Sequence, residues 1–213
     1  MSETFTPRAS DALIVVDMQY DFMPGGALPV AEGDAIVPLV NRLASKFAAV
    51  VLTQDWHPKG HASFASSHPR AQPFETIRLA YGEQVLWPDH CVQKSRGAEL
   101  HRGLDIGHAL LVLRKGANPA VDSYSAFVEA DGVSKTGLAG FLRERGVDRV
   151  FLCGLATDYC VGFSALDARA AGFEALVVED ACRGIDLNGS LAAAWAKMNE
   201  AGVARIDADR IAG

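Results

Sequence analysis

The sequence predicts an α/β fold with a three-layer, doubly wound, mostly parallel sheet and helices on both faces. Short runs rich in Val, Leu and Ile alternate with longer segments of helical character along the 213 residues. This alternation is typical of βα units, because strands of a parallel sheet are buried on both faces and read as continuous apolar runs. A chain of this length can bury a large core, so we expect one domain over residues 1–213.

The first half of the chain contains two expected strands and one expected helix. The run ALIVVD at residues 12–17 and the run AAVVLTQ at residues 48–54 are short and apolar, as buried strands are. Residues 33–47 have helical character, and Pro38 comes early enough to be tolerated. Residues 55–108 have many Pro, His, Gly and Ser residues and weak periodicity. We expect a long loop excursion there, and such excursions in compact domains usually serve a function.

The second half continues the same alternation. Strands are expected in the apolar runs at residues 109–115, 148–154, 174–181 and 202–206. Helices are expected in the segments between them, at residues 138–145, 159–171 and 190–202. Gly172 is suited to end the second of these helices, because glycine readily adopts the left-handed conformation that follows a helix.

Composition and charge exclude several classes of function. The formal net charge of −6 and the lack of a Lys and Arg cluster argue against a nucleic-acid partner, because duplex affinity depends on clustered cations. No basic segment precedes a long apolar stretch near the start, and runs such as ALLVL are too short to span a membrane, so we expect a cytoplasmic protein. The cysteines, at positions 91, 153, 160 and 182, form no CxxC pair, so we expect neither a disulfide framework nor a thiolate zinc site.

Four residues whose side chains can act as acids, bases or nucleophiles lie at or after the ends of expected strands. Asp17, Asp55 and Lys115 close the first three strands. Cys160 follows the fourth strand by six residues. Each residue alone has a structural explanation, as a cap, a solvated cation or a small buried side chain. Because ligands of open parallel sheets bind outside the carboxyl ends of the strands, we expect all four to face one crevice.

Cys160 has the clearest local argument for a chemical role. If Thr157 or Asp158 caps the following helix, the thiol lies in the first helical turn, where free N–H groups and the helix dipole favour a thiolate. Asp17 could accept the thiol proton and pass it to a leaving amine, while Lys115 holds the carboxylate in place. The three side chains together indicate nucleophilic catalysis.

The stretches DWHPKGH and WPDHC contain a candidate metal site. Asp55 and His57 are separated by one residue, so on an extended segment both point to the same side. His90 comes from the same excursion. One carboxylate and two imidazoles can hold Zn²⁺, Fe²⁺ or Mn²⁺ and leave positions open for water or substrate. On spacing alone, His61 and His68 are alternative candidates for metal ligands.

Over nearly its full length the chain resembles the nicotinamidase branch of the isochorismatase-like cysteine hydrolases. The stretches that carry the resemblance are LIVVDMQYDFMPGGAL, TQDWHPKGHASF, WPDHCVQKSRGAEL, RKGANPAVDSYSAF and FLCGLATDYCV. Their combined order is specific, whereas VVDMQ or LATDYC alone would indicate only the wider superfamily. The resemblance implies hydrolysis of nicotinamide to nicotinate and ammonia through a cysteine thioester, in NAD salvage, with pyrazinamide as a further substrate.

The resemblance also implies the catalytic residues. Asp17, Lys115 and Cys160 would form a catalytic triad. A cis peptide between Leu155 and Ala156 would direct the N–H groups of Ala156 and Cys160 toward one point, as an oxyanion hole requires.

Two further sets of residues follow from the same resemblance. The implied ligands of one divalent metal ion, with Zn²⁺ first and Fe²⁺ or Mn²⁺ as alternatives, are Asp55, His57 and His90. Ser63 stands where some relatives have a further histidine, so its contact with the metal is expected to run through water. A ring nitrogen of the substrate would bind the metal directly or through water. The implied contacts of the pyridine ring are Phe22, Leu28, Trp87, Ala156 and Tyr159.

Other functions stay open at this point. An amidohydrolase of the same superfamily could act on an N-carbamoyl or ureido compound, but many such relatives lack the metal pair. A catalytically silent binding or oligomer-building module would not need all three triad side chains. An isochorismatase acts on a vinyl ether and usually lacks the nucleophilic cysteine. The expected partner is a small-molecule substrate, and a homo-oligomer is compatible with the sequence.

Overall fold

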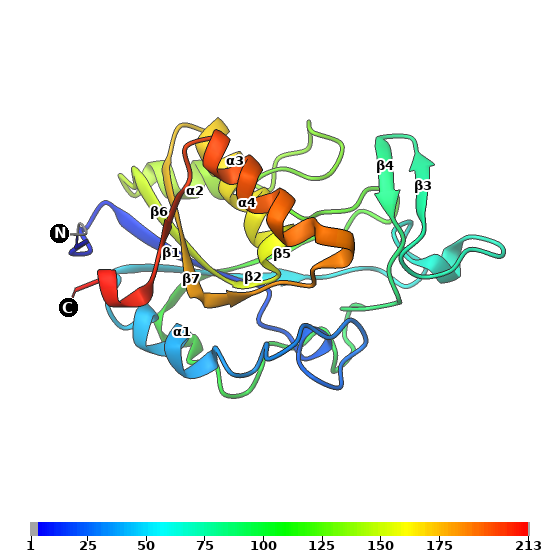
Figure 1. Cartoon of the computed structure of the whole chain (residues 1–213), viewed down its shortest axis with the longest axis horizontal. Coiled ribbons are helices and arrows are strands. Elements are labelled where there is room, and N and C mark those ends of the chain that lie inside the picture. Colours follow the sequence, from blue (N-terminus) through cyan, green and yellow to red (C-terminus); the bar gives the residue numbers. More distant parts are fainter. Residues whose placement is uncertain (1–3, 213) are drawn as a thin grey trace.

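The computed structural model describes residues 4–212 and has a six-stranded sheet at its centre (Figure 1). The strand order is β5–β2–β1–β6–β7–β8, and every neighbouring pair is parallel. The strands are β1 (Asp11–Val16), β2 (Ala49–Asp55), β5 (Ala109–Lys115), β6 (Arg149–Leu155), β7 (Glu174–Arg183) and β8 (Ala204–Ile206). The fold class predicted from the sequence is confirmed.

Helices cover both faces of the sheet. In Figure 1, α1 lies on one face, and α3 and α4 lie on the other. The α-helices of the described residues are α1 (Val37–Ala44), α2 (Leu138–Glu144), α3 (Gly162–Ala170) and α4 (Ser190–Glu200). Short 3-10 turns lie at Tyr20–Phe22, Ala65–Ser67, Ile106–His108, Leu187–Gly189 and Ala208–Arg210.

Two helices begin later than the sequence predicts. Helix α1 starts at Val37 rather than at residue 33, with Pro38 in its first turn and residues 31–36 forming turns. Proline is favoured in a first turn, because the N–H that it lacks would have no helical partner there. Helix α3 starts at Gly162, because residues Thr157–Val161 form a separate π-helical turn.

The long excursion after β2 contains a hairpin that the sequence analysis did not predict. Strands β3 (Thr76–Leu79) and β4 (Gly82–Val85) pair antiparallel and project at one end of the molecule (Figure 1). Most of their side chains are exposed or half-buried, and polar and apolar residues alternate only over the four residues of β3. The exception is Gln84, which is buried.

The central strands bring the predicted site residues to one edge of the sheet. Strands β1, β2 and β6 are buried along their whole length. Strand β1 lies between β2 and β6, and the register pairs Asp55 with Lys115 across β2 and β5. The loops that follow β1, β2, β5 and β6 therefore leave the sheet side by side.

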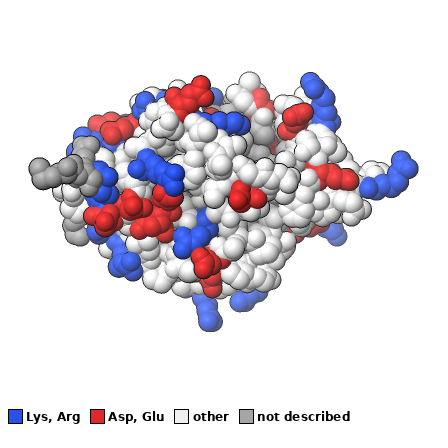
Figure 2. Space-filling model, viewed as in Figure 1, with Lys and Arg blue, Asp and Glu red and all other residues white. Residues whose placement is uncertain are grey.

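Positive and negative side chains are mixed on the surface. On the face shown in Figure 2, Lys and Arg are interspersed with Asp and Glu. Duplex binding depends on clustered cations, and this face does not present them as a single patch. Within residues 4–212, no helix has the length and apolar character needed to cross a membrane.

Candidate active site

Three buried ionisable side chains meet at the carboxyl edge of the sheet. Asp17 follows β1, Lys115 ends β5, and Cys160 lies in the turn after β6. The Nζ atom of Lys115 is 2.8 Å from Asp17 Oδ2 and 3.4 Å from Cys160 Sγ. A carboxylate oxygen of Asp17 lies within 4.8 Å of the sulfur. The structure thus brings together the three residues that the sequence predicts for catalysis.

Asp17 is held by a contact that sequence reasoning missed. The Thr53 hydroxyl donates to Asp17 Oδ1 at 2.5 Å and accepts from the Asp17 N–H at 3.1 Å. Asp17 has a φ of 47°, in the left-handed region that Asp tolerates better than most residues. Thr53 lies inside the apolar run of β2, and nothing in the sequence distinguishes it from an ordinary strand threonine.

Burial determines the charge states of these groups. Burial raises the pKa of the Cys160 thiol well above its ordinary value, although the Lys115 ammonium acts in the opposite direction. Burial also raises the pKa of Asp17. Burial alone would lower the pKa of Lys115, but the carboxylates of Asp17 and Asp55 raise it well above its ordinary value. The site at rest therefore favours a neutral thiol beside an ammonium group.

The predicted helix-terminus activation of Cys160 is wrong. Neither Thr157 nor Asp158 caps the helix, because the turn that contains Cys160 has no side-chain cap. The Asp158 carboxylate instead accepts from the N–H groups of Ile185 and Asp186, at 2.9 and 2.8 Å. Since the pKa of the thiol is raised, activation must come from a neighbouring base.

The turn after β6 returns Cys160 to the sheet edge. The N–H groups of Tyr159 and Val161 both donate to the Ala156 carbonyl at 3.1 Å, which closes a tight turn. The peptide bond between Leu155 and Ala156 is cis, as the resemblance implies. The oxyanion role of the Ala156 and Cys160 N–H groups stays a prediction.

Asp55, His57 and His90 form the predicted cluster of metal donors. One ligand atom of each lies within 4.8 Å of the other two. The Nε2 atoms of His57 and His90 lie 3.5 and 3.7 Å from Asp55 Oδ2. Although burial opposes it, Lys115 holds the pKa of Asp55 well below its ordinary value, so the carboxylate is charged, as a ligand must be.

The two imidazoles are oriented to present Nε2 as the ligand atom. Each Nδ1 lies against a backbone carbonyl, that of Gly116 for His57 at 3.0 Å and that of Pro88 for His90 at 2.8 Å. Each Nδ1 therefore carries the proton, and Nε2 keeps its lone pair. His57 Nε2 is buried and has no hydrogen-bond partner within residues 4–212. A divalent metal ion fits this donor set.

Two local features hold the metal donors in place. The Gln19 side chain accepts from the N–H of Asp55 and donates to its carbonyl, both at 2.8 Å. Gly116 has a φ of 69°, and a Cβ at this position would lie 2.5 Å from the His57 ring. Gly116 is therefore required both by its backbone conformation and by the close approach of the imidazole.

Ser63 lies beside the donor cluster. Its hydroxyl is 2.8 Å from His61 Nδ1, and His61 Nε2 lies against the carbonyl of Asn118 at 2.9 Å. The predicted water-mediated contact of Ser63 with the metal stays a prediction. Asp122, which sequence reasoning missed, also lies near the donors, with Oδ1 at 4.0 Å from His57 Nε2.

A pocket joins the nucleophile to the metal donors. The residues that line it are Phe22, Leu28, Asp55, Trp87, His90, Asp122, Tyr124, Ala156, Tyr159, Cys160 and Ile185. All five residues predicted to contact the ring are among them. Asp122, Tyr124 and Ile185 were missed, because the spacing of the sequence gives no signal that they converge on this pocket.

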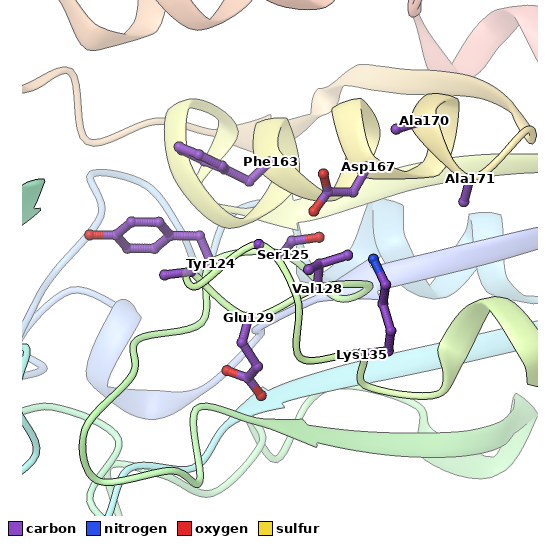
Figure 3. Close-up of a pocket in the computed structure, with 11 residues that line it drawn as sticks. Tyr124, Ser125, Val128, Glu129, Lys135, Phe163, Asp167, Ala170 and Ala171 are labelled. Atoms are coloured by element: carbon purple, nitrogen blue, oxygen red, sulfur yellow. The ribbon is translucent and has the colours of Figure 1, made fainter. Parts of the chain in front are cut away.

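A larger hollow shares Tyr124 with this pocket and lies between α3 and the segment before α2 (Figure 3). Its lining residues are Tyr124, Ser125, Val128, Glu129, Ala130, Gly132, Lys135, Phe163, Asp167, Ala170 and Ala171. None of the triad residues and none of the three metal donors lines it. The smaller pocket is therefore the candidate active site.

Fold and site together define a hydrolase that is built on a doubly wound parallel sheet, with a cysteine, a carboxylate and a lysine at the sheet edge. Residues 11–210 match the sequence profile of the isochorismatase domain, and the chain belongs to that family.

Within the family the chain is similar to nicotinamidases. It is 55% identical over 200 residues to the nicotinamidase of Acinetobacter baylyi, covering 94% of each chain. It superposes on the nicotinamidase and pyrazinamidase of Acinetobacter baumanii with a TM-score of 0.94 at 56% identity, covering 95% of this chain and 98% of that one.

Two relatives were solved with ligands. The L. infantum PnC1 structure, in complex with nicotinate, is 41% identical with a TM-score of 0.86, and the match covers 98% of both chains. The Pyrococcus horikoshii pyrazinamidase structure, in complex with zinc, is 41% identical with a TM-score of 0.76, covering 93% of this chain and 99% of that one. These matches confirm the resemblance inferred from the sequence.

Proposed function

We propose that this chain hydrolyses nicotinamide to nicotinate and ammonia, with Cys160 as the nucleophile. The observation that carries the proposal is the contact of Cys160 with Lys115 and Asp17 in a pocket that Asp55 and His90 also line. The high identity to nicotinamidases favours this substrate over an N-carbamoyl or ureido compound. Pyrazinamide is a further substrate, and the predicted cytoplasmic location fits a role in NAD salvage.

The first half of the reaction forms a thioester and releases ammonia. Asp17 takes the proton of the Cys160 thiol, and the sulfur attacks the carboxamide carbon. The N–H groups of Ala156 and Cys160 donate to the oxyanion that forms. Collapse of this adduct breaks the C–N bond, and Asp17 returns the proton to the departing nitrogen. Lys115 offsets the negative charge on Asp17 and on the sulfur throughout.

The second half hydrolyses the thioester. Asp17 now takes a proton from water, and the resulting hydroxide attacks the thioester carbon. The same N–H groups stabilise the second oxyanion. Collapse breaks the C–S bond, the proton on Asp17 returns to the sulfur, and the product leaves as nicotinic acid, which releases its remaining proton to water to become nicotinate. The chain is thus restored with a neutral thiol, the state that burial favours.

Asp55, His57 and His90 would hold the divalent metal ion, which we propose to be Zn²⁺. When bound, the ion supplies a Lewis-acidic centre that orients the pyridine ring. The residues of the pocket wall, Phe22 and Trp87 among them, exclude water around the ring and align the carboxamide with Cys160. The zinc complex of the P. horikoshii relative supports this choice of metal.

Release of ammonia from nicotinamide tests the proposed activity. The purified chain is expected to release one ammonia and one nicotinate per nicotinamide consumed, and to act on pyrazinamide as well. Nicotinate is measured by chromatography and ammonia by a coupled assay. An N-carbamoyl amino acid serves as the comparison substrate. Turnover of that compound without turnover of nicotinamide would refute the proposed substrate.

Loss of one imidazole is expected to remove the metal. The His57→Ala variant should bind the divalent ion more than about 100-fold more weakly, because even residues that only orient a metal ligand are worth 10- to 100-fold in affinity. Metal content per chain is measured by elemental analysis after dialysis. His68→Ala is the matched control, because His68 Nε2 pairs with the Ala62 carbonyl at 2.7 Å and lies outside the donor cluster. Equal metal contents in the two variants would contradict the assignment of His57.

A further inference from the structure

The six-stranded sheet ends in two edge strands, β8 and β5, which differ in how they are protected. An edge strand presents unpaired N–H and C=O groups, and natural proteins keep such edges short, charged or covered. Strand β8 follows this rule, because it has only three residues. Its Arg205 pairs with Glu179 and lies 4.4 Å from the centre of the Trp195 ring, so a charge stands on this edge.

The opposite edge strand, β5, is longer and mostly apolar. Its seven residues, ALLVLRK, pair with β2 alone within residues 4–212. The register with β2 skips Leu110, so the irregularity is confined to the start of the strand, and residues 111–115 are regular. Lys115 is buried, which leaves Arg114 as the exposed charge of the strand. The outer backbone groups of β5 are therefore available to another strand.

Exposed apolar side chains gather at this edge. Six large hydrophobic side chains are exposed within residues 4–212, and three of them lie on β5 or in the turn before it. These are Ile106, Leu110 and Val112, with exposed fractions of 57%, 52% and 44%. Single exposed apolar residues are common on protein surfaces, but a contiguous group of them marks a surface that binds a partner.

Backbone and charge at this edge favour a second copy of β5 as the partner. Unpaired N–H and C=O groups along a strand are satisfied by another strand, and the exposed Leu and Val side chains require that strand to be apolar. Asp105 lies just before β5 with 53% of its side chain exposed, and Arg114 is exposed near the end of the strand. In antiparallel order, each Arg114 would lie toward the end of the other strand that carries Asp105. Parallel order would instead bring like charges together.

We propose that β5 is a homodimer interface, at which two copies of this chain pair antiparallel across a twofold axis and join their sheets into one. Such a contact is isologous, because the same surface serves both partners. Leu110 and Val112 of each copy pack against the same residues of the other, as cross-strand pairs do. Neither residue lines the active-site pocket, so the interface does not depend on the proposed hydrolysis of nicotinamide.

Sedimentation velocity over a series of protein concentrations tests the interface. The full chain should form a dimer with a dissociation constant on the order of 10 μM, because one pair of strands makes a small interface. Val112→Lys should raise this constant at least about 10-fold, since lysine on an edge strand blocks pairing. Val112 is exposed, so the melting temperature should not change. Val133→Lys is the matched control, because Val133 is 75% exposed but lies outside every strand, and it should leave the constant unchanged.

Charge reversal tests the antiparallel order of the two strands. Asp105→Arg and Arg114→Glu should each raise the dissociation constant about threefold or more, because the twofold axis removes two contacts at once. The double variant restores opposite charges and should return the constant toward that of the unchanged chain. A constant in the double variant above that of both single variants would overturn the antiparallel order. A monomer at every concentration, or a dimer that Val112→Lys leaves intact, would overturn the interface.

Discussion

Replacement of Cys160 by alanine is expected to lower kcat for nicotinamide by at least about 10⁴-fold, the scale on which loss of a catalytic nucleophile acts. Among the cysteines of residues 4–212, Cys160 is the one that lines the pocket, with its Sγ 3.4 Å from Lys115 Nζ, so another thiol should not take its place. The side chain is buried and small, so alanine removes one atom and should leave the fold intact. Turnover is measured by ammonia release, and folding by circular dichroism.

A control variant and mass spectrometry of the reacting enzyme test this prediction further. Cys182→Ala changes another buried cysteine, in β7, and should retain wild-type turnover. Wild-type protein quenched with acid during turnover should carry a nicotinoyl group on the peptide that contains Cys160, detected by mass spectrometry. Full activity in Cys160→Ala, or a nicotinoyl group on a different residue, would eliminate the thioester mechanism.

The convergence of Asp17, Lys115 and Cys160 could be predicted from the sequence because it depends on topology alone. In a parallel sheet every strand presents its carboxyl end at the same edge, so residues that follow strands must be neighbours there. Continuous apolar runs locate such strands with little ambiguity. The metal donors Asp55 and His57 could be predicted for the same reason, since Asp55 ends β2 and His57 comes two residues later.

Properties that depend on tertiary burial could not be predicted from the sequence. The raised pKa of Cys160 comes from burial of the thiol, and the position of the thiol near a helix start indicated the opposite direction. Thr53 and Gln84 are ordinary polar residues in the sequence, and the contact of Thr53 with Asp17 and the burial of Gln84 arise only from the tertiary fold. In the hairpin that carries Gln84, polar and apolar residues alternate only over the four residues of β3 and not in β4, so its period-2 signal is short.

Replacement of Lys115 by methionine is expected both to abolish turnover and to destabilise the fold by about 3 to 5 kcal/mol, the cost of leaving a buried ionic partner uncompensated. The Lys115 side chain is fully buried between the carboxylates of Asp17 and Asp55. Methionine has a similar volume but no charge, so two carboxylates would face each other without a cation. The free energy of unfolding is measured by denaturant titration.

The pH dependence of this destabilisation has a definite sign. The Lys115 ammonium lowers the pKa of Asp17 in the wild type, against the larger effect of burial, so its loss raises that pKa further. The folded variant then binds a proton that the unfolded chain releases, and its stability must rise as pH falls. The difference from wild type should therefore be smaller at pH 5 than at pH 8. Lys197→Met, which changes an exposed lysine on α4, is the control and should alter the free energy of unfolding by less than about 0.5 kcal/mol. An equally small effect of Lys115→Met would contradict the ion-pair role of Lys115.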